Sequence, residues 1–145
     1  MSLSKRRLII DDVVKTLKGI QSPRLGKIST KPEDFSRLAR TAYPFVSVNV
    51  SGEEKEDIAV GRRLSTLTVD ITVHLDGKSK TKNTEQQLAD IIEVIEEELE
   101  KDRTRGKNAL LTELLAVGEM QEMSYPTVSQ TMSVGIQYSY LTGNT

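Results

Sequence analysis

The segment 131–140, TMSVGIQYSY, alternates between apolar and small polar residues with a period of two. Because successive side chains of a β-strand point to opposite faces, this pattern predicts a strand with one buried and one wetted face. Followed back to Val128, the strand spans thirteen residues, or roughly 43 Å at about 3.3 Å per residue. Most strands have only about five or six residues. We therefore expect a sheet that extends beyond an ordinary small core. The residues predicted to be buried are Met132, Val134, Ile136, Tyr138 and Tyr140.

Length and composition indicate one domain over residues 1–145, with enough chain to bury a hydrophobic core. The absence of cysteine excludes disulfides, thiolate metal sites and cysteine nucleophiles. No apolar run approaches the roughly 20 residues that span a bilayer. Asp11 and Asp12 interrupt the first apolar stretch too early for a signal peptide. We therefore expect a soluble protein without a membrane segment.

Charge is spread unevenly along the chain, although the net charge is only -1. Residues 1–50 hold ten Lys and Arg against four Asp and Glu, whereas residues 84–102 hold one against eight. Opposite patches on one domain can serve head-to-tail self-association, and both can equally be solvated faces. Near-neutral overall charge argues against a dedicated nucleic-acid binder, because general affinity for phosphate needs concentrated basic residues.

Periodicity predicts the order helix, short helix, strand, strand, helix, strand, strand. This order indicates an α+β domain, in which an antiparallel sheet is built from two β-hairpins and the helices pack on one face. Regions 22–43 and 51–63 are predicted to be long loops, the first of them containing the short helix. The helices are expected at 5–20, from Pro32 to Ala42 and at 84–101, and the clearest strands at 45–50, 64–75 and 128–140.

The segment from Leu110 to Val117 is ambiguous, because its leucines fit either a short helix or a twisted strand with a bulge. We favour the strand.

The sequence gives little support for an enzymatic function. His74 is the single histidine and lies two residues from Asp70 on the polar side of a strand, where a carboxylate could orient a catalytic base. An ordinary surface histidine is the simpler interpretation. The sequence contains no GxSxG, Walker, GxGxxG or HExxH motif. We therefore predict no catalytic residues and no cofactor.

Two charged clusters could in principle bind ions. Four glutamates share one face of the 84–101 helix and could hold a divalent cation, but a solvated face is the simpler reading. Three lysines in the turn DGKSKTKN could bind phosphate, although lysines are common in turns. We predict no metal site. The glutamates are Glu93, Glu96, Glu97 and Glu100, and the lysines are Lys78, Lys80 and Lys82.

The order of segments resembles the tail-terminator proteins of long-tailed bacteriophages. The resemblance rests on RRLIIDDVVKTLKGI, YPFVSVNVSGEEKED, GRRLSTLTVDITVHL, TEQQLADIIEVIEEELEKDRT with RG soon after, and VGIQYSY. It implies a virion protein of the tail neck, assembled in the host cytoplasm as a homo-oligomeric ring, typically of six subunits. Such a ring caps the tail tube, stops its growth and presents the surface that joins the head. The implied partners are the tail-tube protein and a head-completion or connector protein, and DNA passes through the lumen without specific binding.

Three sets of residues would carry this work under the resemblance. The segment 51–63 would contact the tube or the next subunit, unless it is a simple surface loop. The acidic helix face would meet basic residues of a neighbour, and the lysines of the 76–83 turn would touch the head connector. The sets are Glu53, Glu54, Lys55, Glu56, Asp57, Arg62 and Arg63 for the tube; Glu93, Glu96, Glu97 and Glu100 with Lys5, Arg6, Arg7 or Lys15 for the neighbour; and Lys78, Lys80 and Lys82 for the connector.

Three other functions compete with this hypothesis. The nearest is another phage ring component, either a tail-tube subunit or a head-completion protein. Tube subunits usually carry long extensions that lock successive rings, whereas this chain has only the short tail LTGNT, which favours a terminator. The more distant alternatives are a small enzyme that uses His74 and a monomeric binding module.

Overall fold

The computed structural model describes residues 4–21, 25–31, 43–76, 84–122 and 127–141. The predicted short helix from Pro32 to Ala42 lies outside the described residues. Within the described ranges the elements are α1 (Lys5–Lys18), β1 (Ile28–Ser29), β2 (Phe45–Ala59), β3 (Arg62–Asp76), α2 (Thr84–Glu100), β4 (Leu111–Val117), β5 (Gln121–Glu122) and β6 (Thr127–Leu141).

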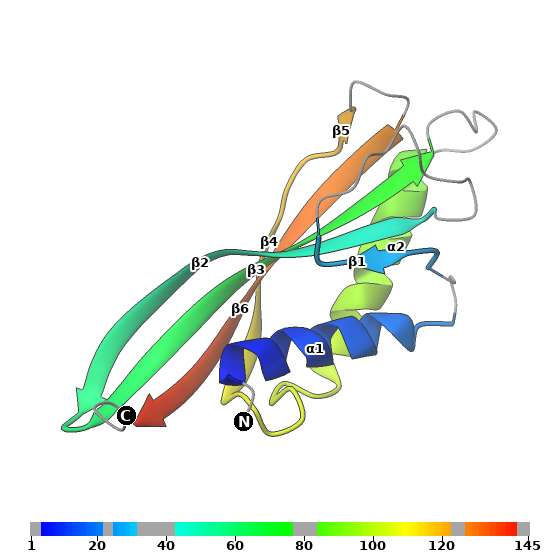
Figure 1. The fold of residues 1–145 in the computed structure, drawn as a ribbon. Helices are drawn as coiled ribbons and strands as arrows, with labels where there is room; N and C mark the ends of the chain where they lie inside the picture. Colours follow the sequence, from blue (N-terminus) through cyan, green and yellow to red (C-terminus); the bar gives the residue numbers. More distant parts are fainter. Residues whose placement is uncertain (1–3, 22–24, 32–42, 77–83, 123–126, 142–145) are drawn as a thin grey trace.

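The strands form one sheet in the order β1-β2-β3-β6-β4, and β5 pairs with β6 outside this path. Figure 1 shows the three long strands β2, β3 and β6 lying side by side in a strongly twisted ribbon. The prediction of a mixed α and β fold is confirmed, and strand dominates. The prediction of a wholly antiparallel sheet is wrong at one edge, because β1 runs parallel to β2. The sequence did not predict β1, because it has only two residues and lies in a segment with the composition of a loop.

Local sequence explains both helices. In α1, the Ser4 side chain accepts a hydrogen bond from the Arg7 backbone N–H at 3.2 Å, and Gly19 ends the helix. Its apolar residues Ile9, Val13 and Leu17 recur every four positions and are buried. In α2 the apolar stripe is also buried and the glutamates between its members are mostly exposed. The buried residues of α2 are Leu88, Ile91, Ile92, Ile95 and Leu99.

The core is a single cluster that joins buried side chains of both helices with inward-facing residues of the long strands. The register places Val69 opposite Val134 and Ile71 opposite Met132, so apolar residues share one face of the sheet. The predicted alternation in 131–140 is confirmed for Met132, Val134, Ile136 and Tyr138, which are buried, whereas Tyr140 is only partly buried.

The prediction of a long loop at 51–63 is wrong. β2 runs through this segment to Ala59, turns at Val60 and Gly61, and returns as β3. Gly61 has a φ of +78°, which glycine adopts without steric strain. The charged composition of segment 51–63 suggested a loop. Pairing with β3 nevertheless supplies its backbone hydrogen bonds, and β3 pairs with β6 on its other side. The composition of this part of β2 therefore did not indicate a strand, because the segment has little apolar surface to bury.

A β-bulge at Ser51 changes the parity of β2. Val50 pairs with Val69 and Gly52 with Thr68, which leaves Ser51 as the extra residue. Before the bulge, even-numbered residues such as Val48 face the core; after it, odd-numbered residues such as Glu53 do, opposite the buried Leu67.

The strand prediction for the ambiguous segment is confirmed as β4, which carries a register shift at Leu115. The short β5 was not predicted. No helix in the described part of the chain is long and apolar enough to cross a membrane.

Candidate subunit interface

The long strands project past the helices as an arm, which we define as residues 51–66 of β2 and β3 together with residues 136–141 of β6. Figure 1 shows this arm reaching away from α1 and α2 toward the lower left. Its end exposes apolar side chains: Ile58 is 50% exposed, Leu141 is 55% exposed and Val60 is fully exposed. The end of the arm therefore carries apolar side chains that the subunit's own core does not cover.

Glu53 is the centre of a polar network at the base of the arm. Its carboxylate forms an ion pair with Arg6 of α1 and accepts a hydrogen bond from the Ser65 hydroxyl. It also accepts a hydrogen bond from Tyr138 at 2.7 Å and pairs with the Lys55 ammonium at 2.9 Å. The Glu53 side chain is only 11% exposed. These contacts fix the start of α1 to all three strands of the arm.

The network keeps Glu53 ionised. Burial alone raises the pKa of this carboxyl, but hydrogen bonds from Ser65, Lys55 and Tyr138 and the charge of Arg6 lower it to about 2. The pKa of Lys55 is raised chiefly by its hydrogen bond with Tyr140 and then by Glu53, and the pKa of Arg6 is raised chiefly by the charge of Glu53.

Replacing Glu53 with glutamine should lower the free energy of unfolding by roughly 1–2 kcal/mol at pH 7, after allowance for solvent screening. The pKa of Glu53 lies below the value of 4.5 for a free glutamate, so its contribution is fully present above pH 4.5 and is lost as the pH falls toward 2. Urea unfolding at pH 7 and pH 3 measures both effects. The matched control is Glu54→Gln on the opposite face, which should change stability by less than about 0.5 kcal/mol. Equal effects of the two variants would contradict the network.

Lys55 and two tyrosines continue this network toward the tip. Lys55 donates a hydrogen bond to the Tyr140 hydroxyl at 2.8 Å and lies 4.7 Å from the centre of its ring. The rings of Tyr138 and Tyr140 stack with centroids 5.8 Å apart. Together these contacts hold the core-facing side of the arm in one arrangement.

The structure divides the seven predicted tube-contact residues into two groups. On the core-facing side, Glu53 and Lys55 share the network, and Asp57 pairs with Arg63 at 2.9 Å. On the opposite face, Arg62 donates a hydrogen bond to Ser139 at 2.9 Å. Glu54 and Glu56 are exposed there and make no ion pair with any described residue. These two glutamates therefore remain available for a partner.

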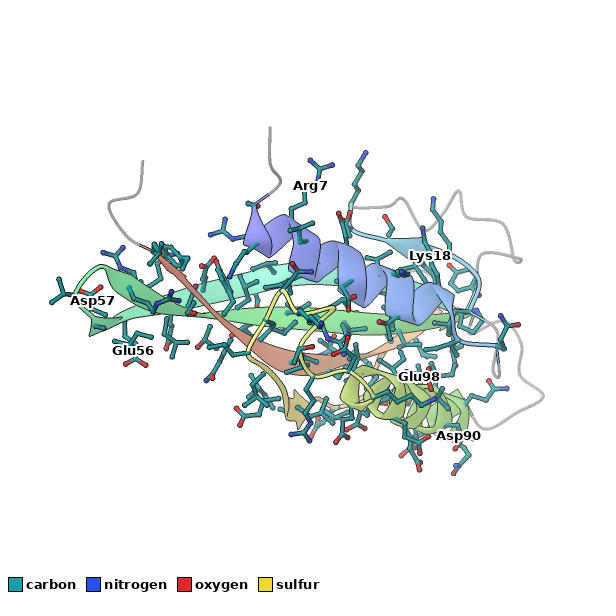
Figure 2. All side chains as sticks on the ribbon, turned by 90° about the horizontal axis from the view of Figure 1, so that it is seen from below. Arg7, Lys18, Glu56, Asp57, Asp90 and Glu98 are labelled. Carbon is teal, nitrogen blue, oxygen red and sulfur yellow. The ribbon has the colours of Figure 1, made fainter. Side chains whose placement is uncertain are left out.

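The predicted pairing of α1 and α2 charges between subunits is partly preempted within the chain. Arg6 is already paired with Glu53, and Lys5 donates a hydrogen bond to the Ser139 carbonyl at 3.0 Å. Glu100 pairs with Arg103 at 3.0 Å. Glu93 and Glu97 are exposed, and burial together with the charges of Glu100 and Glu93 raises the pKa of Glu96. Arg7 points away from the body in Figure 2.

Arg105 was missed by the sequence analysis as an individual site. Its side chain is fully buried, pairs with Asp12 of α1 at 3.2 Å and donates hydrogen bonds to the carbonyls of Leu99 and Asp102. Burial lowers the pKa of Arg105, against the charges of the two aspartates. Arg105 and Gly106 have φ values of +50° and +67°. The compact loop after α2 is thus tied to α1 through one buried cation.

His74 is buried, contrary to the expectation of a surface residue. Its ring stacks on Phe45 with centroids 5.4 Å apart, and its Nε2 forms a 3.3 Å hydrogen bond with the Ser47 hydroxyl. Asp70 instead accepts a hydrogen bond from Ser133 at 2.9 Å. Burial lowers the pKa of His74 to about 4. The two side chains predicted as a possible catalytic pair therefore have different partners.

The sheet has two unlike free edges among the described residues. β1 pairs with β2 only at Val46 and Ser47, so the rest of β2 has β3 as its single neighbour. β4 pairs with β6 on one side only, and its exposed residues include Leu115 and Val117. An unpaired edge is a template for joining another chain.

The remaining predictions concern the lysines of the 76–83 turn and the binding of metal ions. Lys78, Lys80 and Lys82 lie outside the described residues. Within the described ranges, no group of three or more histidines, aspartates and glutamates is placed to hold a metal ion.

Comparison of the sequence with models of known protein families finds no match. Comparison with curated proteins finds none with significant similarity.

Proposed function

We propose that this chain is a tail-terminator protein of a long-tailed bacteriophage, which assembles as a ring, caps the tail tube, stops its growth and provides the head-joining surface. The order of segments that resembles this family supports the proposal. The observation that carries it is the arm of three long strands, which leaves the body and ends in an exposed apolar tip. Such an arm suits a subunit whose surface is completed by a neighbour.

The unlike free edges support a head-to-tail arrangement. A contact between two different surfaces of the same protein closes into a ring when its rotation allows, whereas identical surfaces give a two-fold dimer. β2 and β4 lie on opposite sides of the sheet order, and one subunit offers both. A hexamer is the ring that the resemblance implies.

We infer that α1 and α2 pack on one face of a sheet built largely from two antiparallel units, β2 with β3 and β4 with β6. The other face carries Thr72 and Thr131, hydrogen-bonded at 2.8 Å, and the pair of Ser133 and Asp70. A face of hydroxyl groups without concentrated basic residues would let DNA pass without strong binding to its phosphates. The protein would then lie in the neck of the virion and would not be an enzyme.

The test is tail assembly without this protein. Electron micrographs of tails from infected cells that lack it should show abnormal or variable lengths, and supplying the intact chain should restore uniform tails. Normal tail lengths in its absence would contradict the terminator role. Growth of tubes from this chain alone would instead assign it to the tube subunits.

A further inference from the structure

Two adjoining cavities lie beside the end of α1, far from the arm. The first has a volume of about 520 Å³ and is lined by four apolar residues together with Lys18 and Gln21. The second, of about 510 Å³, shares Ile28 and Lys18 with the first and adds Val14 and Lys15. The apolar lining of the first cavity is Leu17, Ile20, Leu25 and Ile28.

The tip of the arm has the opposite character. Ile58 is half exposed and Val60 is fully exposed at the turn. Next to them on β2, Glu54 and Glu56 are exposed and make no ion pair with any described residue. Lys15 and Lys18, in the last turn of α1, are likewise exposed and make none within the described ranges. The same subunit therefore has a projection with exposed apolar residues and two exposed glutamates, beside Arg62 on the same face, and a hollow of mixed polar and apolar lining beside two exposed lysines.

We propose that the arm tip of one subunit docks into these cavities of a second copy of the chain, where Ile58 and Val60 enter the first cavity and Glu54 and Glu56 meet Lys15 and Lys18. This inference rests on the proposed ring and names the contact that would close it.

The volumes and charges are suited to this contact. A cavity of about 150 Å³ is enough to hold a benzene molecule, so the first cavity has room for two aliphatic side chains. Asp11 also lines the second cavity, but the two lysines leave it with a net positive charge. Complementary charges at the rim of an apolar contact set its register and disfavour wrong partners.

The positions of the two surfaces fit a head-to-tail contact. Figure 2 shows Glu56 and Asp57 at one end of the long axis and Lys18 toward the other end. Figure 1 likewise places β1 and the end of α1 away from the arm tip. Because the tip cannot reach the cavities of its own subunit, each subunit would give its arm to one neighbour and receive an arm from the other.

Disulfide trapping tests the contact directly, because the natural chain has no cysteine. The variant Val60→Cys/Gln21→Cys, mildly oxidised at micromolar concentration, should give a ladder of covalent oligomers on a non-reducing gel. Val60→Cys alone should stop at dimers. The control pair Val60→Cys/Glu97→Cys places the second thiol on the exposed acidic face of α2 and should give no such ladder. A ladder of equal strength from both pairs, or from neither, would overturn the proposal.

Charge reversal provides a second test with its own rescue. Glu54→Lys/Glu56→Lys and Lys15→Glu/Lys18→Glu should each weaken self-association by about tenfold or more in sedimentation, because like charges would then meet. An equimolar mixture of the two variants should associate again, since each arm then meets a cavity of opposite charge. Both variants alter exposed residues, and circular dichroism checks that they fold.

The outcomes separate this contact from the proposed function. Variants that assemble unchanged and still restore uniform tails would reject the docking site while leaving the terminator role intact. A trapped ladder from a protein that does not affect tail length would establish the contact and reject the terminator role. Absence of any self-association in the unaltered chain, alone or on tails, would reject the docking site.

Discussion

Replacing Arg105 with alanine should lower the free energy of unfolding by about 3–5 kcal/mol, because removing one partner of a buried ion pair leaves the other groups without compensation. Asp12 would lose its partner in the loop that follows α2, and the carbonyls of Leu99 and Asp102 would lose their hydrogen-bond donor. For a domain of this size, the melting temperature should fall by roughly 10 °C or more. Urea unfolding monitored by circular dichroism measures the loss.

The matched control is Arg103→Ala, two residues earlier in the same loop. The Arg103 side chain is 52% exposed and pairs with Glu100 at the surface. Exposed ion pairs contribute at most about 1 kcal/mol, so this variant should unfold almost like the natural protein. A loss in Arg105→Ala no larger than that of the control would show that the buried cation does not hold α1 against the loop.

Acid should destabilise the protein through His74. The pKa of this ring is about 4 in the folded protein, against 6.5 when it is free, because burial disfavours the charged form. The unfolded chain therefore binds a proton between pH 6.5 and 4 that the folded chain does not bind. Stability falls across this window by about 3 kcal/mol and is recovered as the pH rises above 6.5.

Two measurements check this prediction. His74→Gln should remove most of the loss between pH 6.5 and 4 when unfolding free energies are compared across that range. Because the chain has one histidine, its imidazole signals in an NMR titration are unambiguous and should have a midpoint near pH 4. A midpoint near 6.5, or an identical pH dependence in the variant, would contradict the buried neutral ring.

Much of the fold follows from residue periodicity. The apolar stripes of α1 and α2 and the alternation in β3 and β6 are strong because each element buries one face, and burial is what periodicity reports. The outer half of β2 has no such signal, since it carries charged residues on both faces. Its strand structure depends on pairing with β3 across the turn at Val60 and Gly61, which is a tertiary property.

The candidate interface was predictable only in part. The charges of segment 51–63 marked it as a contact surface, but its sequence did not reveal that Glu53 is satisfied inside the subunit while Glu54 and Glu56 are not. That difference comes from the bulge at Ser51 and from the distant residues Arg6 and Tyr138. Arg105 gave no signal because a cation in a loop of charged residues resembles a surface residue, and only the packing of α1 shows that it is buried.

The extra residue at position 51 determines which side chains in the outer half of β2 face the core. A regular ladder without the bulge would pair Ser51 with Thr68 and turn every later residue of β2 to the other face. Glu54 and Glu56 would then lie opposite Ser65 and Arg63, where Lys55 and Asp57 lie now. No single substitution farther along could correct such an exchange. A one-residue insertion or deletion between Gly52 and Asp57 would likewise exchange the two faces on one side of the change, unless a further bulge absorbed it.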